Sequence, residues 1–331
     1  MFVFLSPRVI ATSCAILIAL QIAGTVLAQD PAAKQSPQML GTIKESDISE
    51  SSGLAISGIT PDAFWTHNDS GNSAHLFLVA TNGKTLARCK LKNAKNRDWE
   101  AMCSFDHDGI PWLMVADVGD NSLKRTKLKL YLLPEPTLSA EKSVEKKSKK
   151  KKKKSKKSSE KIESDASVVE FTYSDGAHNV EAAAVTPDGK SVWFIEKIYS
   201  NDPRRIRPGI YKLDLKATDF QIGENEDPPF YSAGRLADFP IRNVTGMAFS
   251  PDGRRLIIRN YLNAHVFTRP EGKTWAEVVA SVKPTPVVMP IQSQGEAICF
   301  TRDSKSVLIT SEFKRSTIWK VDLPAAENQV K

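Results

Sequence analysis

The sequence has few of the residues that most often carry catalysis or bind transition metals. It holds 5 histidines and 4 cysteines in 331 residues, and it has no Cys-x-x-Cys pair. It also lacks a P-loop, a Rossmann glycine fingerprint, a His-Glu-x-x-His pair and a Gly-x-Ser-x-Gly elbow. Classes of protein that depend on those motifs are therefore excluded.

Cysteine usage gives little support for disulfide bonding. Cys14 lies in the N-terminal apolar run, and removal of that run leaves Cys89, Cys103 and Cys299. An odd number of cysteines permits at most one disulfide within the chain. Cys103 and Cys299 stand within apolar stretches that are expected to form strands, so we expect buried free thiols.

The net charge of +8 comes from one short segment. Residues 141–161 hold twelve lysines and three glutamates, a net charge of +9, which leaves −1 for the rest of the chain. The folded part is close to neutral, and no specific nucleic-acid recognition is expected. The segment repels itself and has little to bury, so residues 141–165 are predicted to be a disordered Lys-rich insertion. A solvated insertion is favoured over a tether to anionic surfaces.

Only the N-terminus has a long apolar run. Arg8 precedes the apolar stretch Val9–Leu27, and Val26-Leu27-Ala28 offers a small-residue cleavage site. Residues 1–28 are therefore predicted to be a secretory signal peptide, followed by a linker at 29–38 and by a periplasmic or secreted protein. The alternative is an uncleaved N-terminal anchor, because the run nearly reaches membrane-spanning length. No transmembrane domain is expected after cleavage.

One local pattern recurs five times along the chain. A polar pair is followed by small or apolar residues, a short strand, a turn with Asp and a second strand. The copies begin at Glu50, Asp98, Asn179, Asn243 and Gln294, and their turns carry Asp62, Asp108, Asp188, Asp252 and Asp303. Two of the turns read Pro-Asp-Gly, a sequence whose residues each favour a tight turn.

The spacing of the turn aspartates predicts a β-propeller. Successive spacings are 46, 80, 64 and 51 residues, and the longest contains the lysine segment. A period near 50 suits one four-stranded blade. We expect an all-β, five-bladed propeller over residues 39–324 with a tail at 325–331, and six blades as the alternative. Strand Leu40–Lys44 is expected to pair with Thr317–Leu323 and close the ring, and Trp275–Ser281 has helical character.

Polar residues stand at the start of each repeat and again two residues later. Residues two apart share one face of a strand, and the first strand of a blade lines the central channel. Converging oxygen donors without thiolates suit Ca²⁺. The predicted metal ligands are Asp98, Glu100, Asn179, Glu181 and Glu296. The alternative is that the glutamates pair with basic groups or backbone amides and plug the channel.

The second strand of each repeat runs back, so its polar end reaches the same mouth. The predicted ligand-binding residues at these ends are Asn68, Asp69, Asp117, Lys197, Arg259, Tyr261 and Glu312. Basic side chains beside a cation suit an anionic small molecule or an envelope polymer. Glu181 is the candidate for activating water and His67 the candidate general base, although a lone histidine at a loop end is more often a hydrogen-bonding residue.

Several short motifs carry a family resemblance. They are Ser51–Leu54, Trp65–Gly71, Asp98–Met102, Asn179–Ala182, Arg259–Tyr261 and Gln294–Ala297. With these motifs the chain resembles the SdiA-regulated and phytase-like esterase group of bacterial propellers, distantly similar to NHL-repeat proteins, from about Leu40 to Leu323. The resemblance implies five or six blades, a location outside the cytoplasm and a calcium site in or near the channel, and its phytase-like label implies esterase chemistry as one candidate activity. Ser52 and Thr245 depart from the pattern, since other repeats have Glu there.

Three functions remain open from the sequence. A binding module with a calcium-assisted polar pocket leads, because no nucleophile–base pair stands out. A metal-dependent hydrolase of phosphate esters or lactones is the first alternative. A scaffold that recruits macromolecules through its flat face and its lysine segment is the second. Whether the protein is an enzyme is left undecided by these residues.

Overall fold

The computed structural model describes residues 36–139, 159–199, 207–223 and 227–325. The predicted signal peptide, Cys14 and most of the lysine segment lie outside these residues. Among the described residues, no helix has the length and apolar character needed to cross a membrane. The described residues all lie in one compact unit, which spans Gln35–Lys331.

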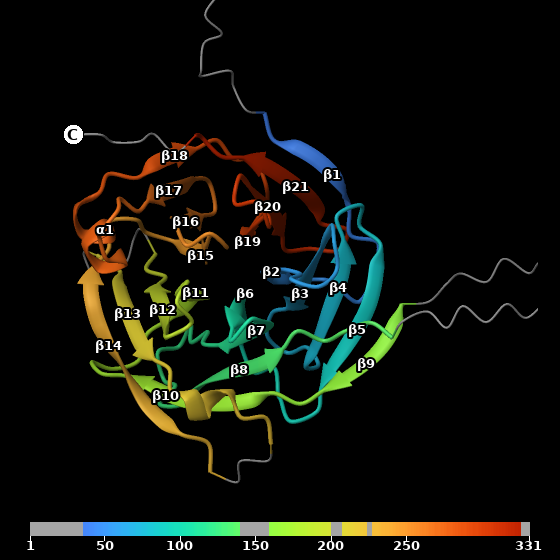
Figure 1. Ribbon diagram of the computed structural model, residues 1–331, viewed down its shortest axis with the longest axis horizontal. Coiled ribbons are helices and arrows are strands. Elements are labelled where there is room, and N and C mark those ends of the chain that lie inside the picture. The colour runs from blue at the N-terminus through green and yellow to red at the C-terminus, as the bar shows by residue number, and fades with distance from the viewer. Residues whose placement is uncertain (1–35, 140–158, 200–206, 224–226, 326–331) are drawn as a thin grey trace, which may run out of the picture. The chain divides into compact units, whose positions relative to one another are not determined.

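Five inner strands stand around one axis (Figure 1). They are β2 (Ser51–Ile56), β6 (Trp99–His107), β11 (Val180–Val185), β15 (Val244–Phe249) and β19 (Gly295–Phe300). Each inner strand contacts the next in this order, and β19 contacts β2, so the inner ring is closed. Each is also the innermost strand of a sheet that extends outward from the axis.

The first three sheets follow the chain order outward. The first adds β3 (Ala63–Asn68), β4 (His75–Ala80), β5 (Thr85–Leu91) and β9 (Glu160–Ser164). The second adds β7 (Ile110–Asp117), β8 (Leu128–Pro134) and β10 (Ser167–Tyr173). The third adds β12 (Ser191–Glu196), β13 (Gly209–Asp214) and β14 (Phe230–Asp238). Parallel pairing of β10 with β14 joins the second and third sheets at their outer edges.

The last two sheets complete the ring. The fourth adds β16 (Arg255–Asn260), β17 (Ala264–Thr268) and β18 (Thr285–Val287), and the fifth adds β20 (Ser306–Ser311), β21 (Thr317–Asp322) and β1 (Gln38–Thr42). Two short helices, η1 (Ala217–Phe220) and α1 (Trp275–Ser281), lie between strands. All the strands of the described residues belong to these five units, and the expected β-propeller fold is confirmed.

The N-terminal strand closes the ring, as the sequence predicts. β1 lies outside β21 (Figure 1) and pairs with it antiparallel, with Gln38 opposite Lys320 and Thr42 opposite Thr317. Ile43 continues this pairing, because its backbone N–H donates to the Ser316 carbonyl at 2.9 Å, and its side chain is buried. The first and last parts of the described chain therefore share one sheet.

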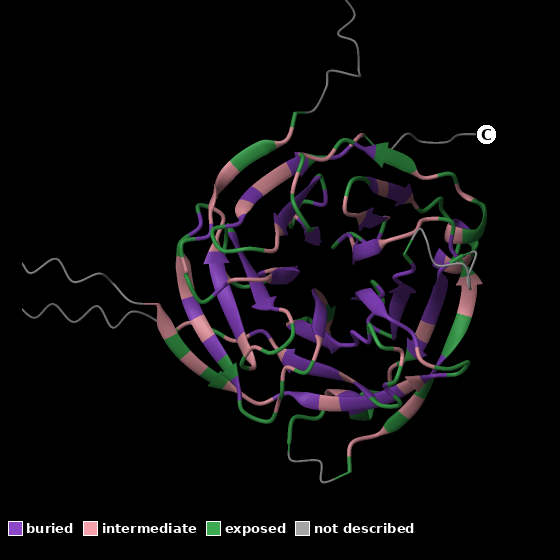
Figure 2. Ribbon diagram, turned by 180° about the vertical axis from the view of Figure 1, so that it is seen from behind, coloured by how far each residue is buried: buried purple, intermediate pink, exposed green. Residues whose placement is uncertain are grey.

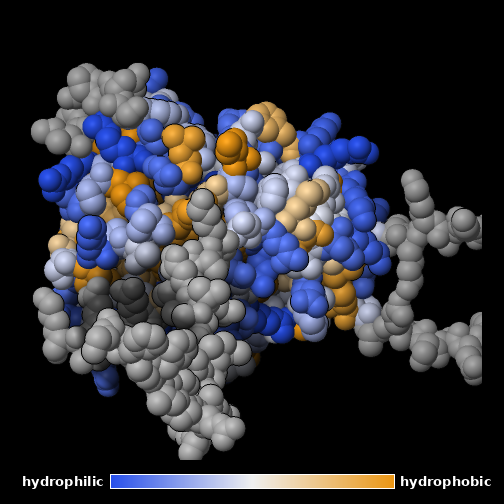
Figure 3. All heavy atoms as spheres, turned by 90° about the horizontal axis from the view of Figure 1, so that it is seen from above, coloured by the Kyte–Doolittle hydropathy of each residue, from blue (hydrophilic) through white to orange (hydrophobic). Residues whose placement is uncertain are grey.

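Burial explains why the strands near the axis read as unbroken apolar runs. Every residue of β11 and β12 is buried, whereas in the outer strand β14 every residue except Ala233 is exposed or partly buried. Figure 2 shows the same gradient from the inner to the outer strands. A strand covered on both faces has no need for polar alternation. The side of the ring seen in Figure 3 mixes hydrophilic and apolar residues.

The repeated aspartate turns form as expected. In three of them the Asp Oδ1 atom accepts the backbone N–H two residues later, at 3.2 Å for Asp188, 3.0 Å for Asp252 and 3.1 Å for Asp303. The glycines that follow Asp188 and Asp252 have φ of 69° and 68°, a conformation that favours glycine. These turns fix the register of each innermost hairpin.

Several local expectations can be compared with the structure. Cys89, Cys103 and Cys299 are buried free thiols, and Trp275–Ser281 is helical, both as expected. The end of the Lys-rich insertion differs. Residues 160–164, placed in the disordered segment 141–165, form β9, which pairs parallel with β5. The outer edge of the first sheet offers unpaired backbone groups, and pairing them outweighs the high charge of this segment.

Removing β1 should destabilise the whole ring, because it exposes the edge of β21 and the surface that Ile43 covers. A chain that begins at residue 44 is expected to unfold at lower guanidinium concentration than one that begins at residue 36, and to self-associate in sedimentation experiments. Equal unfolding midpoints for the two chains would contradict closure by β1.

Candidate functional site: an acidic mouth

A β-bulge recurs near the start of each inner strand. The strand pairing slips between Ser51 and Gly53, between Trp99 and Ala101, and at the equivalent place in the other three repeats. The residues that the pairing skips are Ser52, Glu100, Glu181 and Thr245 in the first four repeats, and Glu296 with Ala297 in the fifth. A bulge leaves the extra residue out of the ladder and redirects its side chain. The second polar residue of each predicted pair is therefore the bulged residue, and all five are buried.

Three carboxylates gather where the first and second sheets meet. Asp69 follows β3, Asp98 precedes β6 and Glu100 is bulged in β6, and one carboxylate oxygen from each lies within 4.8 Å of the others. Gly119 lies against them. A Cβ added at Gly119 would come within 2.5 Å of Asp98 Oδ2 and would also collide with Glu100 Oε1. Any residue other than glycine at position 119 would displace these two carboxylates.

Glu181 and Lys197 form a buried ion pair beside this trio. Lys197 Nζ donates to Glu181 Oε1 and, at 2.6 Å, to Tyr261 Oη. The ammonium also lies over the Tyr261 and Tyr199 rings, 4.9 and 5.5 Å from their centroids. Lys197 is thus held by three neighbours, and its pKa is raised because the attraction to Glu181 outweighs the cost of burial.

The fourth and fifth sheets contribute Arg259, Glu296 and Glu312 to the mouth. Glu296 and Glu312 share a side-chain hydrogen bond, which requires a proton on one of them. Arg259 is fully buried, and its Nη1 donates to the Ala297 carbonyl at 3.2 Å. Its guanidinium occupies the space where a side chain at Gly295 would begin. Burial lowers the pKa of Arg259 to about 10.

The carboxyl groups of the mouth resist ionisation together. Burial is the main cause for each, and their mutual repulsion adds to it. The pKa is raised to about 6 for Asp69, about 7 for Glu181 and Glu296, and about 8 for Glu312, and it is raised for Asp98 and well above the ordinary value for Glu100. The neighbours that raise the pKa of Glu100 include Glu181 and Glu296. The three predicted channel glutamates therefore lie close to one another.

Other residues named from the sequence have structural partners. Asp117 pairs with Arg125 at 2.7 Å and accepts the backbone N–H of Asp98 at 3.2 Å. Asn68 Oδ1 accepts the backbone N–H groups of Ser49 and Glu50, at 3.0 and 3.1 Å. These contacts fix the loops that carry the acidic mouth. The roles predicted for Asn68 and Asp117 as ligand-binding residues stay predictions.

His67 and Asn179 are also engaged within the protein. His67 is fully buried, its Nδ1–H donates to the Asn68 carbonyl at 3.0 Å, and burial lowers its pKa to about 4. It is therefore neutral at pH 7. Asn179 Oδ1 accepts the backbone N–H of Asp120 at 2.8 Å, and its Nδ2 donates to Asn121 at 3.1 Å. Neither belongs to the carboxylate trio.

Two parts of the site are absent from the sequence-based set. Glu50 lies near Glu312, to which it is joined by an isolated β-bridge, and its charge adds to the raised pKa of Glu312. Gly119 makes room for the trio, and it stands between Asp117 and Asp120 in the sequence. Glu50 was visible as the head of the first repeat. The requirement for glycine at position 119 comes from its distances to the Asp98 and Glu100 carboxylates, and the local sequence does not contain those distances.

The raised pKa values predict that stability falls as the pH rises. The ordinary pKa is 3.8 for Asp69 and 4.5 for Glu181, Glu296 and Glu312, and the unfolded chain loses these protons near those values. The folded state holds the same protons up to pH 6 to 8. The folded state binds more protons in this pH range, so the free energy of unfolding decreases as the pH rises.

Urea unfolding with a chelator present should give a lower midpoint at pH 8 than at pH 5. In Glu312→Gln the urea midpoint should change less with pH near pH 8, where Glu312 loses its proton. A midpoint that rises with pH would contradict the acidic mouth.

Comparison with known proteins adds no family assignment. No protein-family model matches the chain, and no curated protein matches it. Among solved structures, it is similar to a chain of a nidogen/laminin complex, with 11% identity, a TM-score of 0.40, and coverage of 80% of this chain and 73% of that one. It is also similar to the Neurospora crassa Pan2 WD40 domain, with 11% identity, a TM-score of 0.41, and coverage of 90% and 97%. The resemblance to the SdiA-regulated and phytase-like group stays a prediction.

Proposed function

We propose that the protein is an exported β-propeller binding module that holds a divalent cation, calcium by its donor chemistry, at the acidic mouth. The observation that carries this proposal is the convergence of oxygen atoms from Asp69, Asp98 and Glu100 within 4.8 Å. Carboxylates this close repel one another unless they are protonated or share a cation. Oxygen ligands without thiolate or imidazole suit Ca²⁺ better than zinc.

Unpartnered oxygen atoms support the same site. Glu181 Oε2 and Asp69 Oδ1 are buried and have no hydrogen-bond partner among the described residues. A buried polar atom without a partner costs roughly 1–3 kcal/mol. A bound cation would relieve this cost and the repulsion within the trio. The residues that would hold it are Asp69, Asp98 and Glu100, with Glu181 beside them.

The charge balance decides how an anionic ligand would bind. Seven carboxyl groups face or adjoin the mouth (Glu50, Asp69, Asp98, Glu100, Glu181, Glu296 and Glu312). They outnumber the nearby basic groups, which are Lys197, Arg259 and, beside Asp98, Arg125 and the exposed Arg97. The three buried basic groups, Lys197, Arg259 and Arg125, are engaged within the protein. An anionic small molecule or envelope polymer would therefore bind through the cation, and the cation is the primary ligand of this proposal.

Export is proposed from the N-terminal sequence. Residues 1–28 have the charged start, apolar run and small-residue site of a secretory signal, which supports a periplasmic or secreted location. Millimolar calcium is common in such compartments, where a weak site can be filled.

Calcium binding should depend on the trio. We expect isothermal titration calorimetry at pH 7.5 to detect Ca²⁺ binding to the intact chain, and Asp98→Asn with Glu100→Gln to weaken it by about 100-fold or more, since two charged ligands are lost. Asp108→Asn, in an exposed turn at the other end of the inner strands, is the control that should bind normally. Unchanged binding in the double variant, or none in the intact chain, would remove the cation from the account.

One feature favours a second candidate function, a metal-dependent ester or phosphoester hydrolase. Glu181 has an unpartnered oxygen and a pKa near 7, which is the range that suits a general base at neutral pH. Its other oxygen is oriented by Lys197. In this candidate, Glu181 would take a proton from water, and the cation would polarise the substrate oxygen.

The hydrolase candidate predicts calcium-dependent turnover. Generic phosphate-ester, carboxyl-ester and lactone substrates should be hydrolysed with calcium present. Glu181→Gln should lower kcat by about 100-fold or more when it is measured at a calcium concentration that saturates the variant. Absence of turnover with every substrate class, in a protein that binds calcium, would reject the hydrolase and keep the binding module.

A further inference from the structure

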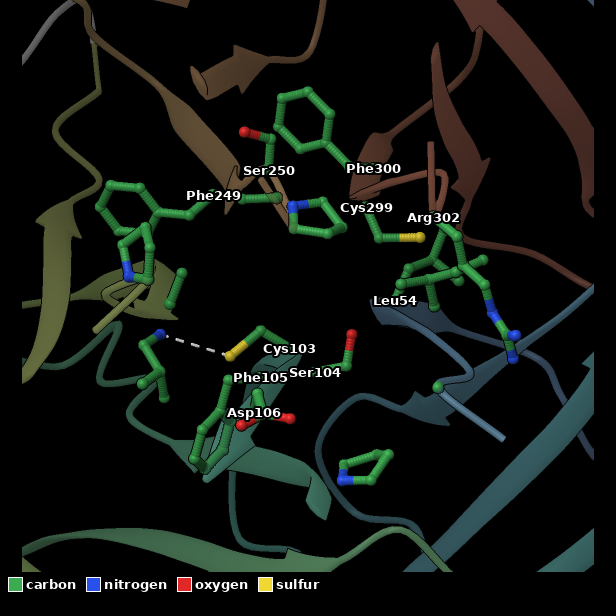
Figure 4. Close-up of a pocket in the computed structure, with 18 of the residues that line it drawn as sticks. Leu54, Cys103, Ser104, Phe105, Asp106, Phe249, Ser250, Cys299, Phe300 and Arg302 are labelled. Atoms are coloured by element: carbon green, nitrogen blue, oxygen red, sulfur yellow. Dashed lines mark hydrogen bonds between the residues drawn. The ribbon is translucent and has the colours of Figure 1, made fainter. Parts of the chain in front are cut away.

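The inner strands enclose a second site at the ends opposite the acidic mouth. A cavity of about 240 Å³ lies there (Figure 4). The acidic mouth is formed by the first residues of the inner strands, whereas this cavity is formed by their later residues and the turns that follow. Its apolar wall contains Leu54, Cys103, Phe105, Phe249, Cys299 and Phe300.

The rim shows that the cavity is open to solvent. Asp106, Pro187, Pro251 and Arg302 line it and are exposed, while Leu54 and Phe300 in its wall are buried. Arg302 is fixed at the rim, because its Nε donates to the Ser57 carbonyl at 2.6 Å. A ligand can therefore enter from the surface without unfolding any strand.

We propose that this cavity binds a small uncharged aromatic molecule about the size of two fused rings. An apolar cavity of about 150 Å³ accepts a benzene ring, so about 240 Å³ fits a bicyclic one. Phe105, Phe249 and Phe300 line the cavity with aromatic carbon, which aromatic ligands prefer. Ring contacts with Phe220 and with Trp275 hold Phe105 and Phe249 in place. A charged group placed among them would lose its hydration, because the charged lining residues Asp106 and Arg302 stand at the exposed rim and Arg302 is already bonded to Ser57.

The two thiols belong to the apolar wall rather than to reactive chemistry. Burial raises the pKa of Cys103 and Cys299 to about 12, so both are neutral at pH 7. Cys103 Sγ accepts the backbone N–H of Val185 at 3.3 Å. Cys89, whose pKa burial also raises to about 12, packs in a different cluster with Trp65 and Leu78 and does not line the cavity. The chain thus contains a matched control thiol.

Calorimetry with indole as the probe tests the proposal. The intact chain should bind indole, and Cys103→Met with Cys299→Met should weaken binding at least about tenfold, because the longer side chains fill the cavity. Cys89→Ala should bind indole like the intact chain. No binding by the intact chain, equal affinity in the filled variant, or equal or tighter binding of hexanol would overturn the proposal.

Thiol labelling keeps the test decisive if the filled variant does not fold. The three thiols have similar pKa values, so differences in their labelling by N-ethylmaleimide report access rather than ionisation. Mass spectrometry of the intact chain should show Cys103 and Cys299 modified faster than Cys89, with indole slowing only those two. Equal rates at all three cysteines, or no protection by indole, would contradict an open aromatic site.

Discussion

The burial of several carboxyl groups around one axis is the constraint on which the rest of the site depends. Glu100, Glu181 and Glu296 come from three inner strands, and each is held inward by a bulge in its own strand. Burial and mutual repulsion both oppose their ionisation. Three means of relief are available, namely protonation, the Lys197 ammonium and a bound cation. Among the described residues, Lys197 is the lysine that bonds to one of these glutamates, Glu181, so the rest of the group needs protons or a metal ion.

The ring architecture keeps these groups together despite their repulsion. Each inner strand is hydrogen-bonded into its own sheet, and the sheets are packed by apolar residues on both faces. A strand cannot withdraw from the axis without breaking that packing, which costs far more than one unfavourable charge contact. The same geometry makes the two ends of the inner strands different. Their polar starts form the acidic mouth, and their apolar later residues form the cavity lined by Cys103 and Cys299.

The repeats made the β-propeller fold predictable from the sequence. The grouping of the site residues was less predictable, because it depends on how distant segments pack together. The periodic turns around Asp188, Asp252 and Asp303 locate the hairpins because their chemistry is local. Closure by β1 follows from counting strands. By contrast, the pairing of residues 160–164 with β5 depends on an edge far away in the sequence. The grouping of Asp69 with Asp98 and Glu100 depends likewise on how two neighbouring sheets meet, and no spacing rule within one repeat contains that distance.

The most direct test of the account is a carboxyl ¹³C NMR titration of the chain labelled at Asp and Glu. In the presence of a chelator, Asp69, Glu181, Glu296 and Glu312 should titrate between about pH 6 and 8, assigned by single Asn or Gln variants. Calcium should move Asp69 below that window. If every carboxyl group titrates below pH 5 without a cation, the carboxylates do not crowd together at the axis and the account is wrong.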